Sequence, residues 1–351
     1  MKKIIMSISL PVGLTLFLYR IYNIYRLVVN RFEIEKEIKK QIQVFSPNSN
    51  GGGNCSLIRD IKKSYVLYLA KPQEYFLFNF IDKTTAERSE YLTDYIKDTY
   101  LKKYARIEKA RQLQDKFYVY EKMRQYYNRE ACLVSNENDR AAFNSFISGK
   151  TRFIAKPNAG SFGANTNIYD LSSSDPVSIF NELLSYKNSW ILEELIEQVP
   201  EISQFNSTSV NSVRIPTFRT KKGYEIFGTF MRVGRKGSVV DNAGAGGIFV
   251  RVDEISGEII SDGFTEQGDI FENHPDSNIP FKGFKIPCYE NLKSIAIKCH
   301  KELPDHKYVG WDFALTKDGW VLLEGNWGQY LCQQVSGLKP MKKQFINLIK
   351  S

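Results

Sequence analysis

The chain has 351 residues, and at roughly 150 residues per domain this length predicts about two domains. With 42% hydrophobic, 13% aromatic and 25% charged residues, its composition is that of a globular protein, which excludes a disordered or collagen-like chain. The 48 Lys and Arg residues exceed the 39 Asp and Glu residues and give a net charge of +9. This excess favours anionic partners such as nucleotides, phosphosugars, acidic lipids or nucleic acid, without choosing among them.

The cysteines and histidines are few and scattered. The five cysteines form no CxxC pair and no spaced Cys/His set that could close around zinc, and there are only three histidines. Cys299 and His300 are adjacent and therefore point to opposite sides of the element that carries them. We expect reduced, mostly buried thiols in a cytosol, and neither a metal-thiolate nor a Cys-His catalytic site.

The N-terminus carries an apolar run from Ile4 to Tyr19 that ends at Arg20. As a helix its 16 residues would span about 24 Å, less than the roughly 30 Å hydrocarbon core, and Pro11 and Gly13 interrupt it. Three interpretations stay open: a helix packed on the body, a membrane-surface anchor with cationic flanks, or a membrane span. We expect a cytoplasmic protein, with the inner face of the cell membrane as the site of any peripheral contact through residues 1–31.

The composition changes twice along the chain. SPNSNGGGN, residues 46–54, predicts a flexible linker, so residues 1–50 form an N-terminal helix with its linker, followed by a helical region over 51–111. From about residue 151, short β-type runs alternate with Gly-rich turns and a few helices. This pattern indicates an α+β fold dominated by antiparallel sheet, without internal repeats.

The strongest local signal is a predicted hairpin from Gly310 to Asn326. Alternating apolar and polar residues place Trp311 on one face and Asp312 on the other. Residues 317–319 suit a three-residue loop, and that loop would bring Asp312 directly opposite Glu324. Asn326 shares the face of Glu324.

Two facing carboxylates repel each other unless a cation or a shared proton lies between them. A small set of hard oxygen ligands suits Mg²⁺, which takes its other ligands from water and substrate phosphates. Asp312, Glu324 and Asn326 are therefore candidate magnesium ligands. The alternative is an ordinary exposed hairpin with polar residues on its wet face.

A second signal is a predicted strand that ends at Lys156 and is followed by a loop containing Gly160, Ser161 and Gly163. Small residues let backbone N–H groups approach phosphate oxygens, and a lysine supplies a compact positive charge. The spacing is not that of a Walker loop, and NAGAGG at residues 242–247 does not match a dinucleotide-binding fingerprint. An ordinary turn is the alternative for the loop.

A third signal is an apolar strand, within residues 189–198, that runs into Glu193, Glu194 and Glu197. Acids at this point could accept hydrogen bonds from an adenine amino group and a ribose. Acids that favour the start of a helix are the alternative.

In this order the signals resemble those of the ATP-grasp ligases, over about residues 112–330. In members such as D-alanine:D-alanine ligase a DK pair begins a helix some forty to fifty residues before the second phosphate lysine, and QDKFYVYEKM places Lys116 there. The resemblance implies two α+β subdomains that grip ATP, a small one over 112–190 and a large one over 191–351. It also implies Lys116 and Lys156 on the ATP phosphates, the backbone from Glu193 to Leu195 at adenine, and the three hairpin residues on magnesium.

The tail is most similar to the sugar-transfer-associated ATP-grasp group, found with bacterial capsule and exopolysaccharide biosynthesis. The similar stretches are VNSVRIPTF, GRKGSVVDNAGAGGIFVRVD, HPDSNIPFKGFKIP and VGWDFALTKDGWVLLEGN. D-Alanine ligases carry an arginine two residues before the first metal acid, where this chain has Gly310. Arg214 and Arg232 are candidates to stabilise the transition state instead, with a surface ion pair as the alternative for each. Asn242 resembles an acceptor-side loop, and His274 is a candidate substrate contact or a structural turn histidine.

The resemblance implies an ATP- and Mg²⁺-dependent ligase. A carboxylate would attack the γ-phosphate to give an acylphosphate and ADP, and an amine or hydroxyl would then displace phosphate. An acidic sugar or amino acid joined to a cell-surface glycan precursor follows from the family context alone. The alternatives are an ATP-dependent phosphotransferase and a non-catalytic, membrane-associated scaffold with a degenerate fold. Nucleic-acid binding is supported only by charge and is not expected.

Overall fold

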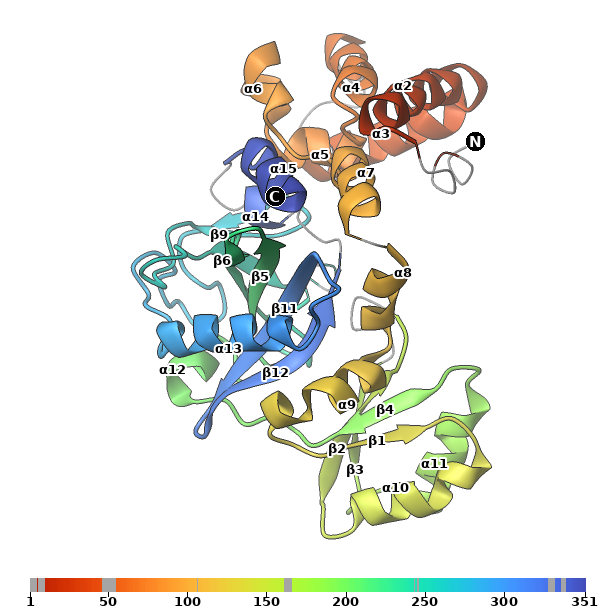
Figure 1. Cartoon of the computed structure of the whole chain (residues 1–351), viewed down its shortest axis with the longest axis vertical. Helices are drawn as coiled ribbons and strands as arrows, with labels where there is room; N and C mark the ends of the chain where they lie inside the picture. Colours follow the sequence, from red (N-terminus) through yellow and green to blue (C-terminus); the bar gives the residue numbers. More distant parts are fainter. Residues whose placement is uncertain are drawn as a thin grey trace.

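The computed structural model describes residues 5, 10–45, 55–105, 107–160, 166–242, 244, 246–327, 332–335 and 339–351. Along its longest axis lie an N-terminal helical part, an eight-stranded sheet and a four-stranded sheet (Figure 1). All strand pairings given for the two sheets are antiparallel, which confirms the predicted α+β class. The predicted linker at 46–54 lies outside the described residues, and the domain boundaries stay a prediction.

The N-terminal part consists of helices of different lengths. They are α2 (Val12–Val29), α3 (Arg31–Phe45), α4 (Cys55–Leu67), α5 (Pro72–Leu77), α6 (Thr85–Ser89) and α7 (Asp94–Tyr104), with a 3₁₀ turn at Phe80–Asp82. Helix α2 begins directly after Pro11, which suits the position before a first turn because it has no N–H to leave unpaired. The helix continues through Arg20, whose side chain is exposed. The predicted apolar helix over residues 4–19 is therefore wrong at its C-terminal end, because α2 continues to Val29.

These helices pack against one face of the large sheet. Their buried side chains, among them Ile38, Tyr65 and Phe78, form a common core with Phe230 and Phe249 of the sheet. Helix α15 (Lys342–Lys350) covers the neighbouring part of the same face, and the short helix α14 (Cys332–Val335) precedes it. One side of α2 is thus packed on the body, as the first of the three interpretations expected.

The large sheet has the strand order β10-β9-β8-β7-β5-β11-β12, with β6 paired to β5. The strands are β5 (Val213–Thr220), β6 (Gly223–Ile226), β7 (Phe230–Val233), β8 (Ile248–Arg251), β9 (Gly263–Phe264), β10 (Ile270–Phe271), β11 (Tyr308–Thr316) and β12 (Gly319–Asn326). Helix α13 (Tyr289–Lys301) covers the face opposite to the N-terminal helices, and its apolar side chains pack with Trp311 and Phe313. The short helix α12 (Pro200–Ser203) precedes β5.

The small sheet has the order β1-β4-β2-β3, and the strands are β1 (Ala131–Val134), β2 (Arg152–Pro157), β3 (Asn167–Asp170) and β4 (Trp190–Glu193). Helices α10 (Arg140–Ile147) and α11 (Pro176–Ser185) close a separate apolar core on it with Phe153 and Trp190. The link from the N-terminal part runs through α8 (Ile107–Ala110), a 3₁₀ turn (Arg111–Gln114) and α9 (Lys116–Tyr127). Figure 1 shows α9 between the two sheets.

The hairpin of β11 and β12 has the predicted acid pairing but a different turn. Thr316 pairs with Gly319, so the loop has two residues rather than three, and Gly319 takes the left-handed conformation that favours glycine. A bulge at Leu323 then inserts one residue into β12 and shifts the register. Because of this shift, Asp312 lies opposite Glu324, as predicted.

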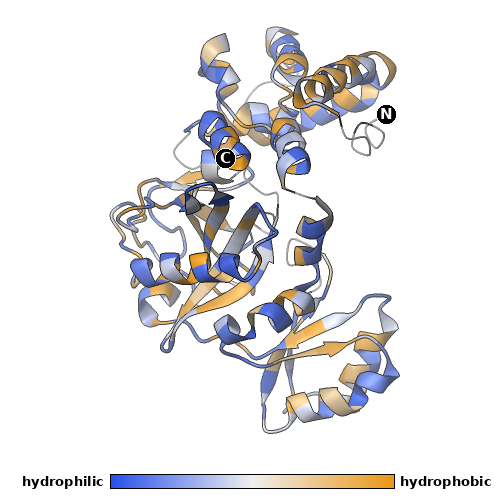
Figure 2. Ribbon diagram, viewed as in Figure 1, coloured by the Kyte–Doolittle hydropathy of each residue, from blue (hydrophilic) through white to orange (hydrophobic). Residues whose placement is uncertain are grey.

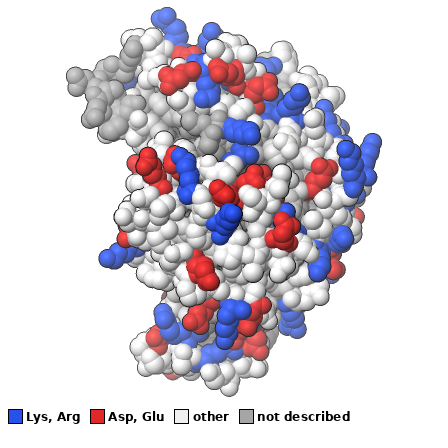
Figure 3. Space-filling view, turned by 90° about the vertical axis from the view of Figure 1, so that its left-hand side faces the viewer, with Lys and Arg blue, Asp and Glu red and all other residues white. Residues whose placement is uncertain are grey.

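The surface carries both signs of charge. On the face drawn in Figure 3, Lys and Arg side chains alternate with Asp and Glu side chains over the parts that the structure describes. That described face therefore offers nucleic acid no continuous basic stripe.

Candidate active site

A cavity of about 1020 Å³ lies where the two sheets and α9 meet. Eleven of the residues singled out from the sequence line it: Lys116, Lys156, Gly160, Glu193, Glu194, Leu195, Glu197, Arg232, Asn242, Asp312 and Glu324. Ser161 and Gly163 lie outside the described residues. The fold thus brings the lysines of α9 and the small sheet together with the acids of the β11–β12 hairpin, although they are far apart in the sequence.

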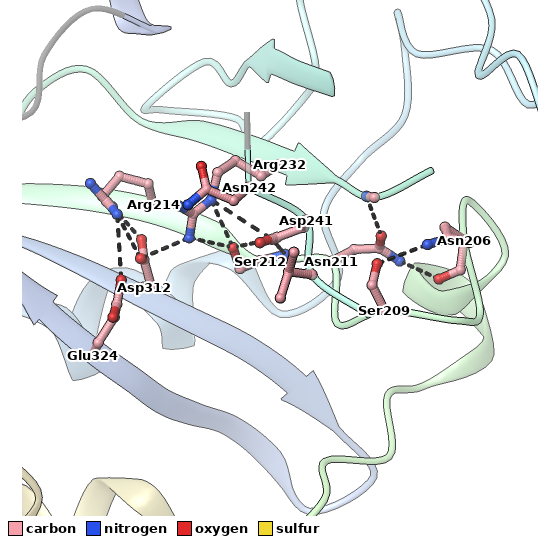
Figure 4. Close-up of polar contacts among 12 residues, drawn as sticks. Asn206, Ser209, Asn211, Ser212, Arg214, Arg232, Asp241, Asn242, Asp312 and Glu324 are labelled. Atoms are coloured by element: carbon pink, nitrogen blue, oxygen red, sulfur yellow. Dashed lines mark hydrogen bonds and ion pairs between the residues drawn. The ribbon is translucent and has the colours of Figure 1, made fainter. Parts of the chain in front are cut away.

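Asp312 is fully buried and bound by two arginines (Figure 4). Arg214 is its cross-strand partner, and its Nε and Nη2 atoms donate to the two carboxylate oxygens, the second at 2.6 Å. Arg232 donates from Nη2 to Oδ2 at 2.7 Å. Burial alone would raise the pKa of Asp312, but the two guanidinium groups outweigh it and hold the pKa at about 2.

Glu324 faces the same arginine from β12. Its Oε1 atom lies 3.9 Å from Nη2 of Arg214 and accepts a hydrogen bond of 2.8 Å from the amide of Asn326. The same amide nitrogen lies 3.2 Å from Oδ2 of Asp312. Burial and the nearby Asp312 carboxylate raise the pKa of Glu324. The repulsion expected between the two acids is therefore offset in this structure by Arg214 and by the bridging amide.

The donor set of this end fits a magnesium ion. Two carboxylates and one amide provide hard oxygens, and magnesium usually binds few protein ligands and keeps water and phosphate oxygens for the rest. Among the described residues no group of three or more His, Cys, Asp or Glu is placed to hold a metal, so the Asn326 amide matters. Its NH₂ group now faces both acids, and its oxygen would face a cation after the amide rotates by half a turn.

The lysines lie at the small-sheet end of the cavity. Nζ of Lys116, in the first turn of α9, donates to the carbonyl oxygens of Pro157 at 3.0 Å and Gly160 at 3.1 Å. Burial lowers the pKa of Lys116. Nζ of Lys156, on β2, lies 3.3 Å from Oε1 of Glu193. Gly160 takes a positive φ of 132°, which favours glycine at this point of the loop.

The two acids at the end of β4 are held by neighbouring side chains. Glu193 is fully buried between Arg129 and Lys156. Glu194 accepts from the backbone N–H of Glu130 at 2.9 Å and pairs with Lys150 at 3.3 Å. The carboxylates are thus engaged within the protein. The segment from Glu193 to Glu197 still lines the cavity, and the resemblance implies adenine at its first part, from Glu193 to Leu195.

His274 does not reach the cavity. It is fully buried, with Nε2 at 2.9 Å from the carbonyl oxygen of Gly234, and Nδ1 accepts from the N–H groups of Asp276 and Ser277. Both ring nitrogens are therefore used within the protein, Nδ1 in its own turn and Nε2 on Gly234, which is the structural alternative to a substrate contact. Asn242 does line the cavity, and its Oδ1 accepts from the N–H of Gly244 at 3.1 Å.

Sequence reasoning missed three side chains that position the predicted ones. Arg129 pairs with Glu193 and donates to the carbonyl oxygen of Leu322 at 2.7 Å, so it joins the small sheet to β12. Oγ of Ser212 accepts from Nε of Arg232 at 3.1 Å and from its Nη2 at 2.9 Å, and donates to Asp241. Ser212 and Asp241 lie in the stretches VNSVRIPTF and GRKGSVVDNAGAGGIFVRVD, which carry the family resemblance. For Arg129 the sequence gives no signal.

The fold is the ATP-grasp fold. A family model described as sugar-transfer associated ATP-grasp matches residues 95–347, and the chain therefore belongs to this family, within the ATP-grasp ligase superfamily. Membership confirms the resemblance seen in the sequence. No curated protein matches the chain.

Many solved structures are similar to this chain. The D-alanine–D-alanine ligase from Bacillus anthracis is 12% identical with a TM-score of 0.41, and 68% of this chain and 67% of that chain are covered. VanG D-Ala:D-Ser ligase from Enterococcus faecalis is 13% identical with a TM-score of 0.44, and 68% of this chain and 61% of that chain are covered. The ATP-grasp ligase PsnB, complexed with minimal precursor, is 11% identical with a TM-score of 0.42, and 75% of this chain and 70% of that chain are covered.

Proposed function

We propose that the protein is an ATP- and Mg²⁺-dependent ligase that joins a carboxylate to an amine or a hydroxyl through an acylphosphate. One observation carries this proposal: the facing acids Asp312 and Glu324 of the large sheet share one cavity with Lys116 of α9 and Lys156 of the small sheet. Positive groups for phosphates and hard oxygens for a divalent cation are what binding of a nucleoside triphosphate requires.

The proposed phosphate contacts replace contacts that the lysines make now. Lys116 would exchange the carbonyl oxygens of Pro157 and Gly160 for phosphate oxygens, and Lys156 would exchange Glu193. The loop with Gly160, Ser161 and Gly163 would supply backbone N–H groups. Asp312, Glu324 and Asn326 would hold magnesium, which when bound neutralises charge on the phosphates.

Arg214 occupies the room that Gly310 leaves. A Cβ atom on Gly310 would lie 3.3 Å from Cδ of Arg214 and 3.2 Å from the hydroxyl of Tyr308, so the arginine of β5 passes directly over this glycine. An arginine from the neighbouring strand would thus fill the space of the side chain that, by the resemblance, D-alanine ligases carry at this position. Because Arg214 is buried behind Asp312, we assign it a positioning role.

Arg232, unlike Arg214, lines the cavity, and we propose that it stabilises the negative charge that develops on the transferred phosphoryl group. Asp312 and Ser212 hold its guanidinium from two sides. A carboxylate oxygen of the substrate would attack the γ-phosphorus and ADP would leave. The nitrogen or oxygen of the acceptor would then attack the acyl carbon, lose its proton and expel phosphate. No side-chain nucleophile is needed, and Asn242 would contact the acceptor.

The substrates are proposed from the family description alone. An acidic sugar or amino acid would be joined to a precursor of a bacterial cell-surface polysaccharide. We place the reaction in the cytoplasm, where ATP is made.

The test is incubation of the purified protein with Mg-ATP and pooled carboxylates and amines. We expect ADP, a coupled product found by mass spectrometry, and a hydroxamate when hydroxylamine is added. Glu324→Gln serves as the control for contaminating ATPases. A phosphorylated product stable to hydroxylamine would instead show a phosphotransferase. Neither ADP nor a thermal shift with Mg-ATP would indicate a non-catalytic scaffold.

A further inference from the structure

Helix α2 turns its buried polar residues and part of its apolar residues toward the protein, and a second set of apolar residues outward. Thr15, Tyr19 and Asn23 are its buried residues. Asn23 donates to the carbonyl oxygen of Tyr65 at 2.7 Å, and Arg26 donates to the hydroxyl of Tyr65 at the same distance. The polar residues of this helix therefore serve its attachment to α4.

The outward side is a continuous apolar face. At 100° per residue its six large side chains fall within an arc of about 100°, and no charged residue lies in that arc. Their exposed fractions run from 41% to 72%, and they are Leu14, Phe17, Ile21, Ile24, Tyr25 and Val28. Phe32, in the first turn of α3, is 87% exposed. Figure 2 shows α2 as a mainly orange helix at the edge of the molecule.

The charge of this segment identifies what covers the face. Residues 1–32 contain five Lys and Arg residues and no Asp or Glu, although the whole chain has 39 acidic residues. A second copy of the chain would bring two such basic segments together, which like-charge repulsion opposes. An anionic lipid surface complements both the charge and the apolar stripe, because interfacial helices combine the two attractions.

A helix in the membrane plane fits this structure better than a membrane span. Helix α2 has 18 residues and is apolar enough to cross a bilayer by length and composition. A span would have to detach Asn23 and Arg26 from Tyr65 and bury them in hydrocarbon, which is costly. Lying flat, the helix keeps these hydrogen bonds and still buries its outward face.

We propose that α2 docks the protein on an anionic lipid bilayer, with Leu14, Phe17, Ile21, Ile24 and Val28 inserted at the level of the headgroups and upper acyl chains. Arg20, exposed beside this face, contacts lipid phosphates. Docking concerns a surface outside the cavity and is independent of the proposed ligase reaction.

The test is flotation of the full-length protein with phosphatidylcholine vesicles that do or do not contain phosphatidylglycerol. We expect the protein to float with the anionic vesicles and less with the neutral ones. Phe17→Gln with Ile21→Gln changes no charge and should reduce the floating fraction about tenfold. Val177→Gln with Ile255→Gln, which alters exposed apolar residues elsewhere, should float like the wild type. Equal melting temperatures verify that each variant is folded.

Three outcomes would overturn the proposal: no flotation of the wild type, equal flotation of the Phe17/Ile21 variant, or a dimer in lipid-free light scattering that this variant converts to monomer. A dimer would mean that a second copy of the chain, and not a lipid surface, covers the outward face of α2. Ligase assays run without lipid, so a failure here leaves the proposed reaction to its own test.

Discussion

The two ends of the cavity hold their charged groups in different ways. At the large-sheet end, Asp312 forms buried ion pairs with Arg214 and with Arg232. At the small-sheet end, Lys116 donates to two backbone carbonyls, and Lys156 keeps 22% of its side chain exposed. The first end is satisfied without a ligand, whereas the contacts of the second are ones that phosphate oxygens can replace.

The difference between the two ends predicts which substitutions affect the stability of the protein and which affect nucleotide binding. Removing one member of a buried ion pair leaves an uncompensated charge inside the protein, so substitutions within the Asp312, Arg214 and Arg232 pairs should cost both folding and turnover. A lysine bound to carbonyls can be removed at little cost in stability, because water can reach the cavity and take its place. Substitutions there should mainly weaken nucleotide binding.

Asp312→Asn should have the largest effect. It leaves Arg214 and Arg232 without their carboxylate, and we expect the free energy of unfolding to fall by about 3–5 kcal/mol. ADP formation should be lost as well. Denaturant unfolding followed by circular dichroism measures the first effect. Asp318→Asn, on the exposed turn of the same hairpin, is the control and should unfold like the wild type. An unchanged midpoint for Asp312→Asn would contradict the contrast between the two ends.

Glu324→Gln should abolish turnover while sparing the fold. Burial and Asp312 raise the pKa of Glu324 in the folded protein, so the wild type loses stability as the pH rises from the unfolded pKa through this raised value. The variant lacks that loss. Its melting temperature should therefore equal or exceed that of the wild type, by more at about pH 8 than at about pH 5.

We expect ADP formation by Glu324→Gln to fall at least about 100-fold. An active variant would remove Glu324 from the proposed magnesium site. A variant that melts well below the wild type would show that Glu324, like Asp312, is needed to balance Arg214.

The sequence predicts contacts that depend on neighbouring residues and fails for those between distant ones. Alternation along one hairpin is enough to place Asp312 on the polar face, and the predicted loop length then pairs it with Glu324. The predicted loop was nevertheless one residue too long, and the bulge at Leu323 restored the pairing. A single sequence does not show such a bulge, because it depends on how β12 packs.

The sequence does not predict contacts between residues that are far apart along the chain. That Arg214 is the cross-strand partner of Asp312 requires knowing that β5 and β11 are neighbours, although 98 positions separate the two residues. His274 could not be placed for the same reason, since its ring contacts Gly234, 40 positions away. The apolar run at the N-terminus was visible, but only the packed structure shows which side of α2 faces outward.

The smallest effect should come from Lys116→Met. The variant loses a charged contact to the ATP phosphates, and we expect the KM for ATP to rise about tenfold, which corresponds to about 1.4 kcal/mol. The melting temperature should not change, because the carbonyl oxygens of Pro157 and Gly160 border the cavity and can bind water instead. Lys122→Met, on an exposed position of the same helix, should leave the KM unaltered. Two results would contradict the comparison: a melting temperature of Lys116→Met as low as that of Asp312→Asn, or an unchanged KM for ATP. Either would show that the contacts at the small-sheet end are not ones that phosphate oxygens replace.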